Sequence, residues 1–147
     1  MAFRFSLEAV LRLRLSYERL ERLRLLALAA MIVRLRDEIA AAAREESVAR
    51  NARHEMLGRG AMAAELQLGV SAEMARARRN RELAERLAAL LRQHVKQSRA
   101  YQAARRKREI LEHLREKKLR EYRREQSRRA QQTLDELFLI RRSYPTE

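Results

Sequence analysis

The stretch LLALAAMIVRLRDEIAAA, residues 25–42, decides the fold class of this chain. Its apolar residues recur at alternating intervals of three and four residues, a period that is typical of the a and d positions of a coiled coil. The positions that share this spacing are Leu25, Leu28, Ile32, Leu35, Ile39, Ala42 and, after a polar interruption at Glu46, Ala49. We therefore predict one long helix from about residue 5 to residue 57.

A second series of the same kind begins at Leu83. It runs through Leu87, Leu90, His94, Gln97, Tyr101, Ala104, Arg108 and Leu111, so several of its positions are polar. Apolar residues return, with spacing that drifts from a strict heptad, at Leu114, Leu119, Tyr122, Leu134, Leu137 and Ile140. This series predicts a second helix over about 71–141, which ends before Pro145 because the residue preceding a proline disfavours the helical conformation.

The segment between the two series contains all three glycines of the chain, Gly58, Gly60 and Gly69. Glycine disfavours the interior of a helix, and Ser71 is a suitable N-cap for the helix that follows. We therefore predict a connection at residues 58–70. A short helical piece at residues 61–68 fits inside this connection.

Two long helices joined by one connection predict an all-α fold with a single domain, a long two-helix antiparallel coiled coil (αα-hairpin). At 1.5 Å per residue, the first helix would measure about 75 Å and the second about 105 Å. The sequence therefore predicts that the connection is partly helical or that about 30 Å of the second helix projects beyond the first.

The composition favours this architecture over a compact enzyme. Alanine, leucine, arginine, lysine and glutamate make up 99 of the 147 residues, whereas glycine and proline together contribute four. Cysteine is absent, which excludes a disulfide framework, and His54, His94 and His113 lack the spacing of a helical zinc site. We predict no catalytic residue, no cofactor or metal site and no small-molecule substrate.

The charge is strongly positive, with a net value of +14. Between Arg76 and Arg108 there are 12 basic residues, opposed only by Glu82 and Glu85. Such a surface attracts an acidic protein or nucleic acid, but Tyr101 is the one aromatic residue in this run, and single-strand binders need several. We favour an acidic protein partner and keep a basic coiled-coil nucleic-acid-binding protein as the alternative. No apolar stretch is long enough to predict a transmembrane helix.

The two ends of the chain carry further apolar residues. Near the N-terminus the apolar stripe is wider than one partner helix would bury, which predicts a second contact there. Its members are Leu7, Val10, Leu11, Leu13, Tyr17, Leu20 and Leu23. Aromatic residues also gather at both ends, at Phe3, Phe5, Phe138 and Tyr144, and antiparallel pairing would bring these two groups together as one apolar terminus.

Three motifs resemble the FliJ family of flagellar type III export proteins. The first is Phe3-x-Phe5-x-Leu7-Glu8-x-Val10-Leu11-x-Leu13-Arg14. The second is the charged run RKREILEHLREKKLREYRRE at residues 106–125, and the third is QTLDEL at residues 132–137. Residues 44–100 are generic helical sequence and add little to the resemblance.

The resemblance implies a cytoplasmic stalk and adaptor that is peripherally associated with the inner-membrane export apparatus. It implies insertion into the hexameric ring of the export ATPase FliI, contact with its regulator FliH and with the export gate protein FlhA, and handling of export chaperones. The residues that the family pattern, with its flanking arginines, assigns to the ATPase ring are Phe3, Phe5, Leu7, Leu11, Leu134, Leu137, Phe138, Arg141 and Arg142.

Overall fold

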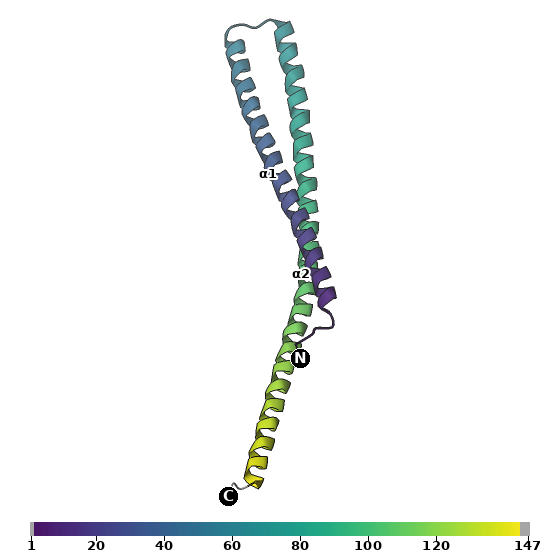
Figure 1. The fold of residues 1–147 in the computed structure, drawn as a ribbon. Helices are drawn as coiled ribbons and strands as arrows, with labels where there is room; N and C mark the ends of the chain where they lie inside the picture. The colour runs from purple at the N-terminus through teal and green to yellow at the C-terminus, as the bar shows by residue number, and fades with distance from the viewer. Residues whose placement is uncertain (1, 145–147) are drawn as a thin grey trace. The chain divides into compact units, whose positions relative to one another are not determined.

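The computed structural model describes residues 2–144 and contains two long helices that pack against each other. Helix α1 spans Glu8–Gly58 and helix α2 spans Ala63–Ser143 (Figure 1). No strand occurs within the described residues. The predicted all-helical fold with two long helices is confirmed.

The connection is shorter than the sequence suggested, because α2 begins at Ala63 instead of near residue 71. The carboxylate of Glu65 accepts a hydrogen bond of 3.3 Å from the backbone N–H of Met62, which caps the first turn of α2. Gly60 has a φ of 79°, a left-handed conformation that favours glycine and completes the turn. Gly69 and Ser71 lie inside α2, and the helical piece expected at residues 61–68 is the beginning of that helix.

The chain divides into two compact units, and each unit contains part of α1 and part of α2. One unit consists of residues 20–101 and the other of the segments 1–19 and 102–147. We call them the hairpin unit and the terminal unit.

In the hairpin unit, apolar side chains of the predicted series form the interface. Leu35, Ala42 and Leu83 are buried together, with Ile39, Leu87 and Leu90 packed against them. Every predicted position of the α1 series from Leu25 to Ala49 is buried or half-buried, as are those of the α2 series from Leu83 to Tyr101. The spacing therefore predicted correctly which faces of the helices meet.

Polar residues of the hairpin unit also find partners across the interface. The amide of Asn80 donates a hydrogen bond of 3.1 Å to Glu46, the residue that interrupts the α1 series. The amide of Gln97 donates to the backbone carbonyl of Glu21 over 3.0 Å, and Arg53 pairs with Glu73. Residues of α1 with lower sequence numbers therefore contact residues of α2 with higher sequence numbers.

In the terminal unit, the N-terminal segment and the start of α1 lie against the middle part of α2 (Figure 1). Leu11 is 6% exposed, and the ring centroid of Phe3 lies 5.6 Å from that of Tyr122. Past Tyr122, α2 continues to Ser143, and no other helix of the described residues 2–144 lies beside it. This length rises about 30 Å, the projection that the unequal helix lengths predicted.

Candidate partner-binding site

The nine residues that the family pattern assigns to a partner fall into two groups with different surroundings. The four N-terminal residues are packed within the chain, since Phe3, Phe5 and Leu7 are half-buried and Leu11 is buried. The five C-terminal residues are exposed on the single-helix part of α2. They are Leu134, Leu137, Phe138, Arg141 and Arg142.

The two groups do not meet at one apolar terminus, so that prediction is wrong. Phe3 lies against Tyr122, and Phe138 follows Tyr122 by 16 residues, a rise of about 24 Å along α2. The physical reason is the difference in helix length, because α2 has 81 residues and α1 has 51. The N-terminal segment therefore meets α2 well before its end.

The single-helix segment of α2, residues 123–143, exposes large apolar side chains in its second half. Its leucine and phenylalanine side chains are all more than half exposed, at 61% for Leu134, 55% for Leu137, 66% for Phe138 and 60% for Leu139. Ile140, at 56%, extends the same cluster. Exposed apolar patches on a soluble chain commonly mark interaction sites.

Polar side chains of the segment pair with one another along the helix. Glu125 accepts from Arg129 over 3.0 Å and pairs with Arg128 over 3.0 Å, and the Gln131 amide donates to Asp135 over 3.0 Å. The hydrogen bond from Arg129 is the main reason why the pKa of Glu125 lies below its usual range, and the charge of Arg128 adds to it. Such pairs support an exposed helix by a few tenths of a kcal/mol each.

Charge at the end of the segment is positive. Arg141 and Arg142 occupy the last turn of α2, where cations interact favourably with the helix dipole. Neither arginine makes an ion pair within residues 2–144. The exposed end of α2 thus offers an apolar cluster followed by two available cations.

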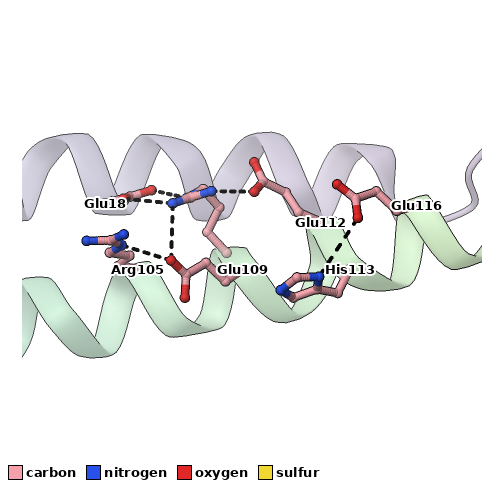
Figure 2. Close-up of polar contacts among 7 residues, drawn as sticks. Glu18, Arg105, Glu109, Glu112, His113 and Glu116 are labelled. Atoms are coloured by element: carbon pink, nitrogen blue, oxygen red, sulfur yellow. Dashed lines mark hydrogen bonds and ion pairs between the residues drawn. The ribbon is translucent and has the colours of Figure 1, made fainter.

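On the N-terminal side of this segment, an ion-pair cluster that sequence reasoning did not pick out connects α1 and α2 within the terminal unit (Figure 2). The guanidinium of Arg108 pairs with Glu18 of α1 and with Glu112 of α2, and both side chains of the first pair are less than one-fifth exposed. The hydrogen bond to Glu18 is the main reason why the pKa of Arg108 is raised, although burial opposes the shift. Arg108 is therefore a stable positive charge.

Further ion pairs extend this cluster along α2. Arg105 donates to Glu109 over 2.8 Å, and Arg115 donates to Glu8 of α1 over 3.1 Å. The sequence carried a signal for the central pair, because the α1 spacing of three and four continues backward from Leu25 through Glu21 and Glu18. Sequence reasoning considered only the apolar residues in this part of α1, so it did not identify Glu18 and Glu21 as interface positions.

Nothing in the described part of the chain resembles a metal centre or a membrane span. No group of three or more histidine, cysteine, aspartate or glutamate side chains within residues 2–144 is placed to hold a metal ion. Over the same residues, neither helix combines the length and the apolar character that crossing a membrane requires.

Comparison of the chain with protein-family models, with curated proteins and with solved structures finds no match. The resemblance to FliJ proteins therefore depends on the three sequence motifs alone.

Proposed function

We propose that the chain is an antiparallel coiled coil that serves as a non-enzymatic stalk and adaptor in flagellar type III protein export. The heptad spacing and the opposite order of contacts along the two helices support the antiparallel coiled coil. The observation that carries the functional proposal is the uncovered segment 123–143, with its apolar cluster and terminal arginines.

In this proposal, α2 alone enters the ring of the export ATPase FliI. An uncovered helix is slimmer than a pair of helices, and the exposed side chains of Leu137 and Phe138 are free to contact the ring subunits. The N-terminal group has a supporting role, because Phe3 and Leu11 pack the start of the chain against the part of α2 that precedes the projecting segment.

The proposed mechanism is mechanical. A single asymmetric helix in a six-fold pore touches only some subunits at one time, so it binds their nucleotide states with different free energies. Such differences promote ring assembly and link ATP hydrolysis to the membrane export gate FlhA, with FliH and export chaperones as the further partners that the resemblance implies.

The test is the ATPase turnover of the purified export ATPase with and without the full chain. We expect the wild-type chain to stimulate turnover and Phe138→Asp to abolish the stimulation. Ile110→Asp is the matched control, because Ile110 lies on the same helix and is also 66% exposed. Absence of stimulation by the wild-type chain, or equal loss in both variants, would overturn the proposal.

The nucleic-acid alternative keeps one supporting observation. In the hairpin unit, the basic residues between Arg76 and Arg99 other than Arg76 are exposed and make no ion pair within the described residues. A mobility-shift assay with a DNA or RNA duplex at about 150 mM salt separates the two functions, because phosphate binding weakens steeply as salt is added.

A further inference from the structure

The α1 helix of the hairpin unit contains a stretch that is apolar around its whole circumference. From Leu25 to Val33, nine consecutive residues are apolar. A helix with this composition is normally buried on all sides, since each exposed face keeps apolar surface in contact with water.

Helix α2 covers only one side of this stretch. Ile32 is 6% exposed and Leu25 and Leu28 are half-buried, whereas Leu23, Leu26 and Val33 are 59%, 55% and 58% exposed. These three exposed residues, together with Ala30, follow intervals of three, four and three residues. We call Leu23, Leu26, Ala30 and Val33 the outer seam, because their spacing repeats that of the interface with α2.

Basic side chains flank the outer seam. Arg22 and Arg34 lie one helical turn from Leu26 and Ala30, and Arg36 lies one turn beyond Val33. All three are exposed and make no ion pair within residues 2–144. Asp37 and Glu38 are the carboxylates at this end of the seam.

This arrangement selects among the possible occupants. A second copy of the chain would place these arginines against one another, and each copy carries a net charge of +14. A membrane-surface helix would be expected to carry tryptophan or phenylalanine on its apolar face, and residues 20–36 contain neither. A helix with acidic flanks satisfies both the apolar seam and the arginines.

We propose that the outer seam binds an acidic amphipathic helix of a partner protein, which packs on α1 as a third helix. The seam extends the established α1–α2 interface around the same helix, so the partner needs only the apolar spacing that α2 already uses. This proposal does not depend on ring insertion, because the outer seam belongs to residues 20–101 and the proposed ring contacts belong to residues 123–143.

The test uses a synthetic fluorescent peptide of three heptads with leucine at the a and d positions and glutamate at the e and g positions. Titration with the full chain at about 150 mM salt, followed by fluorescence anisotropy, measures Kd. We expect the double variant Leu26→Gln, Val33→Gln to weaken binding about tenfold or more. The control is Val48→Gln, on the same helix and 68% exposed, which leaves Kd unchanged.

A second peptide, with lysine replacing glutamate at the e and g positions, tests the role of charge and should bind about tenfold more weakly or worse. Equal binding of both peptides, no binding of the glutamate peptide up to about 100 μM, or binding that the double variant leaves unchanged would overturn the proposal. So would self-association of the chain that the double variant abolishes, or binding to phosphatidylglycerol vesicles that replaces peptide binding.

Two measurements keep the result independent of folding and of the proposed function. Far-UV circular dichroism of the double variant should equal that of the wild type, because both substituted residues are exposed. Stimulation of the export ATPase should also be unchanged in the double variant, so failure of either proposal is distinguishable from failure of the other.

Discussion

The hairpin unit and the terminal unit join the same two helices by different chemistry. In the hairpin unit, the interface is centred on the buried apolar residues Leu35, Ala42 and Leu83. In the terminal unit, Leu11 is buried, but the neighbouring interface positions are filled by the ion pair of Glu18 and Arg108. The spacing of the apolar residues fixes which faces of the two helices meet, whereas the residue type at each position sets how much their contact stabilises the fold.

The two chemistries have different consequences for stability. Removal of apolar surface from water stabilises the folded state directly, so deletion of even one buried methylene lowers the free energy of unfolding. A half-buried ion pair contributes less to the free energy of unfolding, because the cost of removing two charges from water offsets most of their attraction. We therefore expect the hairpin unit to be the more sensitive of the two to substitution at its interface.

The largest effect is predicted for Leu83→Ala. Leu83 is 4% exposed and lies in the centre of the apolar cluster, so its truncation should lower the free energy of unfolding by about 3 kcal/mol. Urea denaturation followed by far-UV circular dichroism measures this change. Val95→Ala, at a position 52% exposed, is the control and should change the free energy of unfolding by less than about 0.5 kcal/mol. Equal losses in the two variants would contradict the importance of the cluster.

An intermediate effect is predicted for Glu18→Gln. This change removes the negative charge that pairs with Arg108 across the interface and leaves an amide oxygen as a weaker acceptor, so we expect the free energy of unfolding to fall by about 1 kcal/mol. Replacement of both residues by leucine makes this interface resemble that of the hairpin unit and should restore or increase stability, measured by the same denaturation. Glu116→Gln, at an exposed position, is the control. A double variant less stable than Glu18→Gln would show that the ion pair contributes more than apolar packing can replace.

The smallest effect concerns the exposed pair of Arg53 and Glu73 in the hairpin unit. The hydrogen bond from Arg53 holds the pKa of Glu73 below its usual range, with burial opposing and nearby arginines assisting. Because the pKa is lower in the folded chain, the pair stabilises the fold above the pKa of an unfolded glutamate. That contribution is lost as the pH falls through the folded pKa.

The measurement is a pH titration of the Glu73 carboxyl carbon by NMR, in the wild type and in Arg53→Gln. The midpoint should rise toward the usual glutamate value in the variant. An unchanged midpoint would mean that the pair does not form in solution. Since both side chains are well exposed, overall stability should change little.

The residue pattern was enough to predict that the chain is helical and which faces of its helices meet. A chain rich in Ala, Leu, Arg and Glu, with apolar residues at intervals of three and four, has few alternatives to a helical fold. The series from Leu25 to Ala49 and from Leu83 to Tyr122 identified the interface positions residue by residue. Local spacing carries this information because the helix repeats every 3.6 residues whatever its partner is.

The register between the helices, and the surroundings of the first and last described residues, became known from the three-dimensional structure. A turn of four residues and an α2 helix that begins at Ala63 place Phe3 against Tyr122 and leave Phe138 uncovered. The same register brings Glu18 to Arg108 and leaves the outer seam of α1 in water. Periodicity does not contain this information, because sliding one helix past the other by a heptad preserves every a and d position while changing every pair.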